Sequence, residues 1–309
     1  MDGFLNIFKP SGMTSHDVVR RIRTLASGIK TGHGGTLDPD AAGVLPLLVG
    51  KGTRLSSYIL ELPKVYRAEL QLGVSTDTED SSGKVVERKT VPDLTEQDLL
   101  KVFKLFQGEI QQVPPMYSSV KKKGKKLYQY ARAGIEVERA PRKVIIYSLQ
   151  MIEFTPPARI LFDVECSKGT YIRTLCAQIG NHLECGGHMS LLLRKQVGPF
   201  TLEDAHPLDD LGDSPGRHKI REFLLPLDYL FREEEGLVLD EADVKDLCSG
   251  RFLTHASLRD KYGEEFPAPV DETVLPVYTK TSVFTLLACW KKDAEDLYYL
   301  KPEKVLKTL

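Results

Sequence analysis

Residues 32–46 read GHGGTLDPDAAGVLP, a glycine-rich loop that leads into an apolar run, and the surrounding domain has to be arranged around it. Asp38 stands directly before Pro39, and a proline disfavours the helical conformation at the residue before it. The carboxylate is therefore expected in an extended loop, followed by a buried strand over residues 43–50. A carboxylate held in this way suits nucleophilic or general-base chemistry. The alternative is a turn aspartate that hydrogen-bonds its own backbone.

The glycines of this loop suggest a nucleotide-binding motif, which the spacing excludes. A P-loop requires G-x4-G-K-[ST], but Gly50-Lys51 is followed by Gly52, and Leu45 occupies the place of the first glycine. The dinucleotide fingerprint fails because Leu37 stands where its third glycine belongs. The loop is therefore expected to present a carboxylate rather than to bind a phosphate.

Short strands and helices alternate along the chain. Strands are expected at residues 3–8, 66–72, 144–154 and 160–166, and helices at 15–26, 94–106 and 171–183. Gly186-Gly187 is interpreted as a turn between two helices, and Glu233–Gly236 as a linker at the end of an acidic stretch. Beyond it, a helix is expected at 241–248 and strands at 273–278, 283–290 and 297–300. This order predicts a mixed α/β domain followed by a compact β-rich tail.

The composition is that of a globular protein, with 41% hydrophobic and 28% charged residues among 309. No apolar run approaches the ~18 residues of a membrane helix, and the N-terminus lacks the layout of a signal peptide. Five widely spaced cysteines argue against a disulfide framework, so a cytoplasmic location is expected. His182, Cys185 and His188 lack the second ligand pair of a zinc site, and no metal is expected.

The net charge of −1 hides an asymmetry, because residues 111–200 carry +8 and residues 201–309 carry −9. In the basic part, cations alternate with aromatic side chains, a pattern that suits phosphate neutralisation and base stacking. The alternative is a charge run that contacts only solvent. The candidate RNA-binding residues here are Lys121, Lys122, Lys123, Lys125, Lys126, Tyr128, Arg132, Arg142 and Lys143.

Two other residues are candidates for the same site as Asp38. A glycine turn before a helix places Arg173 in the first helical turn. An arginine beside an aspartate keeps it ionised and lowers its pKa by ~1–3 units, although Arg173 could equally form a surface ion pair. Tyr66 begins a strand, where it is either a core residue or a stacking face.

Taken in order, these segments resemble the TruB family of tRNA pseudouridine synthases, which convert uridine 55 of the T arm. The resemblance rests on motifs spread over residues 4–200. They are KPSGMTSHD at 9–17, GHGGTLDP at 32–39, GVLP at 43–46, KVY at 64–66, QVPPMYS at 112–118, GTYIR at 169–173, LRK at 193–195 and VGPF at 197–200. The tail resembles the small PUA-like RNA-binding module that ends many bacterial members.

The resemblance implies roles for individual residues. Asp38 corresponds to the catalytic aspartate, Tyr66 to the tyrosine that stacks on the target base, and Arg173 to the arginine paired with the carboxylate. The remaining correspondences are Leu193 with a leucine near the active site, His33 with a histidine associated with flipped-out nucleotides, and Lys9 and Pro10 with an N-terminal motif packed near the site. The resemblance therefore also implies RNA contacts for Lys9, Pro10 and His33.

The resemblance also implies the architecture and the reaction. The fold is expected to be α/β (α+β), a mixed and largely antiparallel sheet flanked by helices. Residues 1–232 would form the catalytic domain, with a basic RNA-binding insertion at about 111–143, and residues 233–309 a PUA-like domain. The reaction moves the sugar from a ring nitrogen to ring carbon 5, so no cofactor is expected. The expected partner is the T stem-loop of tRNA, bound by a monomer without an obligate protein partner.

Several alternatives stay open at this point. Asp38 could attack the sugar carbon, attack the base or abstract a sugar proton. A non-catalytic RNA-binding protein would not need Asp38, Tyr66 and Arg173 together. A synthase that works within a guide-RNA particle would be expected to have longer basic extensions.

Overall fold

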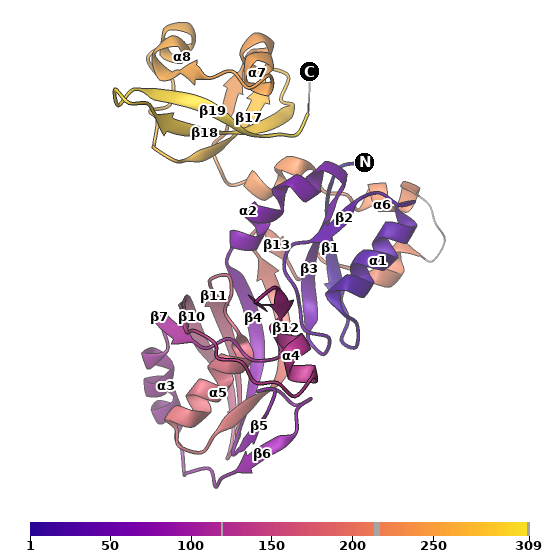
Figure 1. Ribbon diagram of the computed structural model, residues 1–309, viewed down its shortest axis with the longest axis vertical. Coiled ribbons are helices and arrows are strands. Elements are labelled where there is room, and N and C mark those ends of the chain that lie inside the picture. Colours follow the sequence, from indigo (N-terminus) through magenta and orange to yellow (C-terminus); the bar gives the residue numbers. More distant parts are fainter. Residues whose placement is uncertain (119, 213–216, 308–309) are drawn as a thin grey trace.

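The computed structural model describes residues 1–118, 120–212 and 217–307. One ten-stranded sheet runs through the larger part of the chain (Figure 1). In this sheet, only the β1–β14 and β3–β12 pairs of described strands are parallel, which confirms the mixed, largely antiparallel arrangement. The path is β14 (His206–Pro207), β1 (Gly3–Lys9), β3 (Ala42–Val49), β12 (Gly187–Val197), β4 (Lys64–Leu72), β11 (Arg159–Cys166), β10 (Arg142–Thr155) and β7 (Gly108–Gln112), with β2 (Thr31–His33) on β3 and β13 (Phe200–Thr201) on β12.

Helices pack on this sheet in two groups. The helices α3 (Glu96–Leu105) and α5 (Ile172–His182) bury Phe103 and Leu175 against β4, β10 and β11. The helix α1 (Ser15–Leu25) packs on β1 and β3. Capping boxes begin α1 at Thr14 and α3 at Thr95. The shorter helices are η1 (Gly50–Leu55), α2 (Ser56–Glu61), α4 (Leu127–Arg132), η2 (Leu208–Leu211), α6 (Arg217–Glu222) and η3 (Leu227–Phe231).

The interpretation of Gly186-Gly187 as a turn between helices is wrong, because the turn leads from α5 into β12. This strand lies in the middle of the sheet, between β3 and β4. Its pairing with β4 shifts register between Met189 and Leu191 and again between Arg194 and Gln196. Two such irregularities interrupt the apolar–polar alternation by which a strand is recognised in a sequence.

A second, five-stranded sheet forms the C-terminal part of the molecule, which stands apart from the large sheet in Figure 1. Its core includes Trp290, Leu247 and Leu258. The helix α8 is absent from the sequence-based expectation because it buries Leu258 alone. The order is β15 (Leu237–Leu239), β17 (Val274–Thr279), β18 (Phe284–Lys292), β19 (Tyr298–Val305) and β16 (Leu253–Thr254), covered by α7 (Glu241–Cys248) and α8 (His255–Tyr262).

An apolar contact joins the two sheets. Phe231 of η3 lies against Phe284, with 6.0 Å between ring centroids, and Leu287 belongs to the same buried cluster. The Arg54 side chain donates a hydrogen bond of 2.7 Å to the Val305 carbonyl. Much of the acidic stretch before residue 232 forms short helices and the strand β14 along the large sheet, with residues 213–216 outside the described part. Residues 233–236, interpreted as a linker, connect η3 to β15 without helix or strand.

Gly180 of α5 provides a test of this packing. A Cβ at this position would lie 2.4 Å from the backbone of Gly186 and 2.5 Å from that of Gly187. Alanine favours a helix over glycine by about 1 kcal/mol, but overpacking costs about 1–3 kcal/mol, and a backbone cannot rotate out of the way. We expect Gly180→Ala to lower the free energy of unfolding in urea by roughly 2 kcal/mol.

The matched control is Gly32→Ala, because no atom lies within 4 Å of a Cβ at that position. Its stability should stay close to that of the unaltered protein. An equal stability for Gly180→Ala would show that α5 does not pack against the 186–187 turn as described.

Candidate active site

An ion pair between Asp38 and Arg173 forms the centre of the candidate site. Asp38 lies in the loop between β2 and β3, and Arg173 lies in the first turn of α5, as expected from the sequence. The Nε atom of Arg173 is 3.0 Å from Oδ2 of Asp38. The arginine side chain is 5% exposed and the aspartate 41%, so a substrate can reach the carboxylate while the guanidinium stays buried.

Arg173 also holds two other segments. Its Nη1 atom is 3.2 Å from Oδ2 of Asp80 and donates to the Thr78 carbonyl, while Nη2 donates to the Tyr117 carbonyl at 3.0 Å. Asp80 lies in the polar turn between the strands β5 (Val74–Thr76) and β6 (Val85–Arg88). One guanidinium therefore fixes three loops that are far apart in the sequence.

The sequence-based reasoning missed Asp80, because its turn shows only the polar composition of an exposed hairpin. In the structure, the Asp80 carboxylate accepts hydrogen bonds from the Thr78 hydroxyl at 2.7 Å and the Ser82 amide at 3.0 Å. These bonds direct its other oxygen toward Arg173. A signal within the sequence was the T-x-D-x-S pattern of short side chains that hydrogen-bond a neighbouring backbone.

The start of α5 is anchored by Gln112. Its side chain accepts a hydrogen bond from the Tyr171 amide at 2.9 Å and donates one to the Tyr171 carbonyl at 3.2 Å. Tyr171 is the residue that directly precedes the helix. The QVPPMYS segment therefore contributes to the site by placing the helix that carries Arg173.

Burial raises the pKa of the Asp38 carboxyl, and the Arg173 guanidinium, which lowers it, offsets this only in part. The carboxylates of Asp80 and Asp40 raise it further. The expectation of a lowered pKa for Asp38 is therefore wrong in sign. The physical reasons are the removal of water around the carboxyl and the division of the Arg173 charge between two carboxylates.

Lys9 lies beneath the Asp38 loop rather than at the surface. The side chain is buried, and its ammonium donates to the carbonyls of Pro10 at 2.8 Å, Met13 at 2.7 Å and Pro39 at 3.0 Å. Burial lowers its pKa to about 8. This position disagrees with the RNA contact expected of Lys9, because all three donors of the ammonium are used within the protein.

Ser15 and Arg194 hold the same loop from other directions. The Ser15 hydroxyl accepts a hydrogen bond from the Leu37 amide at 2.8 Å and donates one to the Leu37 carbonyl. Arg194 of β12 is buried and donates to carbonyls on both sides of Asp38. The loop is therefore fixed through its backbone, which leaves the carboxylate as the group that it presents.

Three of the expected residues surround this loop. Tyr66 of β4 is partly buried, and Leu193 of β12 pairs with Ala42 of β3 and with Arg67 of β4. His33 lies in β2, where its Nδ1 accepts a hydrogen bond from the Gly35 amide at 3.2 Å. Burial lowers the pKa of His33, and the nearby cations Arg194 and Lys126 lower it further, which favours a neutral ring.

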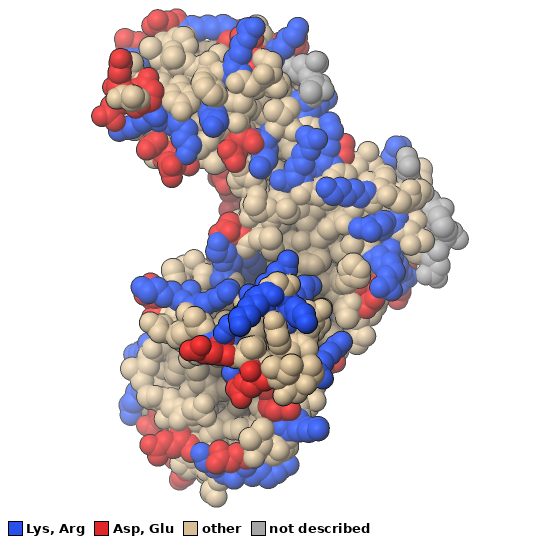
Figure 2. Space-filling view, in the orientation of Figure 1, with Lys and Arg blue, Asp and Glu red and all other residues tan. Residues whose placement is uncertain are grey.

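The expected basic segment forms a hairpin of β8 (Lys121–Lys122) and β9 (Lys125–Lys126), followed by α4. Figure 2 shows Lys and Arg side chains gathered near the centre of this face, over the region of the hairpin and α4 in Figure 1. The Tyr128 ring packs against Lys126, at 5.6 Å, and Arg132, at 5.5 Å. The hairpin lies next to the site, because the Tyr128 amide donates to the Ser118 carbonyl and the neighbouring Tyr117 carbonyl accepts from Arg173.

The individual cations of this surface differ in their availability. Lys121, Lys123 and Lys125 are exposed, whereas the Lys122 ammonium donates to the Glu138 carbonyl. At the start of β10, Arg142 is exposed, but Lys143 pairs with Glu109 of β7 at 2.9 Å. The exposed lysines of the turn are therefore the strongest candidates for contact with phosphates.

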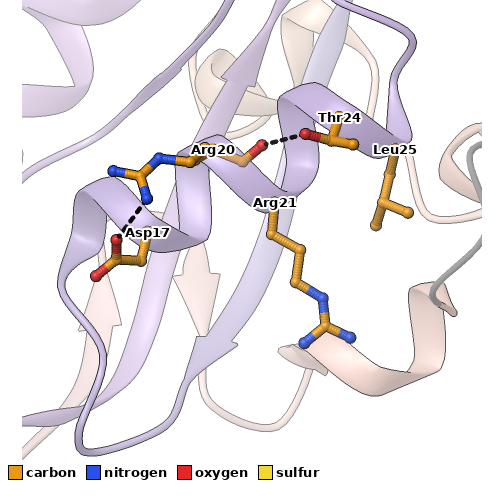
Figure 3. Close-up of a pocket in the computed structure, with 5 residues that line it drawn as sticks. All are labelled: Asp17, Arg20, Arg21, Thr24 and Leu25. Carbon is orange, nitrogen blue, oxygen red and sulfur yellow. Dashed lines mark hydrogen bonds and ion pairs between the residues drawn. The ribbon is translucent and has the colours of Figure 1, made fainter.

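A separate cavity of about 330 Å³ lies beside α1 (Figure 3). It is lined by Asp17, Arg20, Arg21, Thr24 and Leu25. Arg20 pairs with Asp17 at 3.5 Å, and Arg21 pairs with Asp209 at 3.1 Å. None of the residues around Asp38 lines this cavity, and its arginines are engaged within the protein.

The described residues contain no cluster of three or more His, Cys, Asp or Glu residues arranged to hold a metal ion. No helix among them is long and apolar enough to cross a membrane.

Comparison with known proteins identifies the family and the fold. Residues 21–172 match the TruB family pseudouridylate synthase N-terminal domain, and residues 173–232 match the tRNA pseudouridylate synthase B C-terminal domain. The tRNA pseudouridine synthase B of Caldanaerobacter subterraneus subsp. tengcongensis is 44% identical over 92% of this chain and 93% of its own length. That of Streptococcus pyogenes serotype M5 is 41% identical over 99% of each chain.

A solved structure of a Cbf5–Nop10–Gar1 complex includes a chain of similar fold, with a TM-score of 0.72 and 26% identity over 99% of this chain and 85% of that one. The fold and the relatives define an isomerase of the pseudouridine synthase class. Within that class, the chain belongs to the TruB family.

The pKa of Asp38 can be tested directly by substituting Asp80. Because the Asp80 carboxylate raises this pKa and also takes part of the Arg173 charge, Asp80→Asn should lower it. A titration of the Asp38 carboxyl carbon by NMR would measure the change, with Asp93→Asn, at an exposed position, as the control. An unchanged or higher Asp38 pKa in Asp80→Asn would contradict the electrostatic arrangement described.

Proposed function

We propose that this enzyme isomerises uridine to pseudouridine at position 55, in the T arm of tRNA. The observation that carries the proposal is the accessible Asp38 carboxylate, held by the buried Arg173 beside Tyr66 and the basic hairpin. The curated relatives named tRNA pseudouridine synthase B support tRNA as the substrate. The position within tRNA comes from the family resemblance of the motifs.

The reaction rearranges bonds within one nucleotide. The bond between ring nitrogen 1 and the sugar breaks, the uracil turns, and a bond forms between ring carbon 5 and the same sugar carbon. Carbon 5 loses a proton and nitrogen 1 gains one, so the product is an isomer. The balance requires no oxidant and no donated group, and we propose that the enzyme works without a cofactor.

Asp38 is the residue that we assign to this chemistry. Arg173 pairs with Oδ2, and the Asp38 side chain is 41% exposed, so the carboxylate is available to the substrate. The guanidinium favours the ionised form, which any of the three routes for Asp38 requires, against the opposing effect of burial. The carboxylate should therefore act in its ionised form, with a catalytic rate that rises with pH through its raised pKa.

The target nucleotide has to leave its loop to reach Asp38. A flipped base needs an apolar or aromatic face to stack on, and Tyr66 supplies a partly buried ring in this position. Leu193 and His33 lie on the neighbouring strands β12 and β2. We assign Tyr66 to stacking on the flipped base. We assign Leu193 and His33 to the walls of the site that receive the base and its neighbouring nucleotides, and Pro10, next to the buried Lys9, to the same surface.

The RNA backbone outside the site would lie on the basic hairpin. Its exposed lysines and the adjacent Tyr128 and Arg132 combine charge with an aromatic surface. We assign residues 1–232 to the catalytic domain, the segment at about 111–143 to RNA binding, and residues 233–309 to a PUA-like domain. The proposed enzyme is a cytoplasmic monomer that needs only tRNA as a partner.

Substitution of Asp38 tests the catalytic assignment. We expect Asp38→Asn to abolish pseudouridine formation in a tRNA transcript while tRNA binding persists, because the shape of the side chain is kept and the charge is lost. Asp40→Asn is the matched control, since Asp40 is exposed in the same loop. Turnover retained by Asp38→Asn would remove Asp38 from the mechanism.

The hairpin is tested by the salt dependence of tRNA binding. We expect neutralisation of Lys121, Lys123 and Lys125 to glutamine to weaken binding and to reduce the slope of log K against log salt by about 2, since each phosphate contact contributes about 0.7–0.9. Neutralising three exposed lysines elsewhere, Lys84, Lys101 and Lys104, should leave the slope unchanged. The same slope for both triple variants would place the hairpin outside the RNA interface.

A further inference from the structure

We infer that Arg194 is a positioning residue, which sets the distance between the Asp38 loop and the Tyr66 ring. The inference deepens the proposed function and rests on it, because Asp38 and Tyr66 act on the same nucleotide there. Arg194 touches neither the solvent nor the accessible face of the site, and its side chain is 1% exposed. Its effect on the reaction would therefore pass through the groups that it holds.

The guanidinium of Arg194 binds the Asp38 loop on both sides of the aspartate. Its Nη2 donates to the Gly35 carbonyl at 3.1 Å and its Nη1 to the Thr36 carbonyl at 3.4 Å, before Asp38 in the chain. Its Nε donates to the Val44 carbonyl at 2.7 Å, after the loop has entered β3. One rigid group thus spans the loop from its beginning to its end.

The backbone of Arg194 connects this loop to Tyr66. In the sheet, Arg194 pairs with Gly43 of β3 on one side and with Tyr66 of β4 on the other. The contact with Gly43 is close, since a Cβ there would lie 2.2 Å from the Arg194 carbonyl oxygen. The strand that leaves the Asp38 loop and the strand that carries Tyr66 are therefore held on either side of the same residue.

The side chain of Arg194 acts on Tyr66 as well. Burial raises the pKa of the Tyr66 phenol, and the Arg194 guanidinium is the largest influence in the opposite direction. The Asp38 carboxylate adds a smaller upward effect, which places the tyrosine within electrostatic reach of both groups. Arg194 is thus close to the two functional groups whose separation it would determine.

The charge of Arg194 has no carboxylate to balance it among the described ion pairs. A buried guanidinium without a counter-ion is costly, and here it donates hydrogen bonds to three carbonyl oxygens. Lysine is a poor substitute, because a compact ammonium cannot reproduce a planar fork that reaches three carbonyls in different directions. The site therefore requires the shape of the arginine side chain as well as its charge, as expected of a residue that positions other groups.

The experiment compares Arg194→Lys and Arg194→Met with Arg67→Met in steady-state kinetics on a tRNA transcript. We expect both Arg194 variants to lose about 10- to 100-fold in kcat, since a displacement of about 1 Å costs this much, while KM stays within a few fold. Arg67 is the matched control: it lies next to Tyr66 on β4 and pairs with Asp163, outside the site. Wild-type kcat in Arg194→Met would overturn the inference.

A second measurement is independent of catalysis. Hydrogen exchange of the amides at residues 34–44 should become faster in both Arg194 variants and stay unchanged in Arg67→Met. If the unaltered enzyme is inactive on tRNA, the proposed function fails, and the exchange result alone decides whether Arg194 holds the loop. Unchanged exchange at residues 34–44 in Arg194→Met would overturn the inference. This holds even if the variant loses activity, because that loss would then come from lower stability and not from a displaced loop.

Discussion

The ion pair of Arg173 with Asp38 is the interaction on which the site depends. A guanidinium that is 5% exposed must find partners within the protein, and Arg173 finds them in three loops, at Asp38, at residues 78–80 and at Tyr117. These loops leave different strands, and no strand pairing joins them within the part of the chain that the structure describes. The buried cation therefore gives them a common position, and the carboxylate of Asp38 is the group that remains accessible.

Two other buried cations complete this arrangement by binding carbonyl oxygens instead of carboxylates. Lys9 supports the loop at Pro39, and Arg194 supports it at Gly35, Thr36 and Val44. Holding a loop through its backbone leaves its acidic side chain available for chemistry. Burial and the neighbouring Asp80 raise the pKa of Asp38, which disfavours the ionised carboxylate. Arg173 acts in the opposite direction and favours the ionised form.

The basic and acidic parts of the sequence also lie in different places in the structure. The basic hairpin of residues 121–126 lies near the site, because the chain before it binds Arg173 through the Tyr117 carbonyl, and the Tyr128 amide after it donates to the Ser118 carbonyl. Among the described residues, the acidic side chains after position 200 lie in the short helices and turns along the large sheet and in the C-terminal part of the molecule. A net charge of −1 is therefore compatible with a surface that attracts a polyanion, since attraction depends on the local field.

Local patterns in the sequence determined much of this protein: the capping boxes at Thr14 and Thr95, the extended Asp38 before Pro39, and the helix start at Arg173. These features depend on neighbours a few residues away, so the sequence contains the information. The tertiary structure decided the rest. The strand β12 is irregular, so its sequence does not indicate a strand. Asp80 reaches the site from an ordinary polar turn, and Lys9 is buried. Each of these depends on contacts between distant segments, and the sign of the Asp38 pKa shift depends on how much water those contacts exclude.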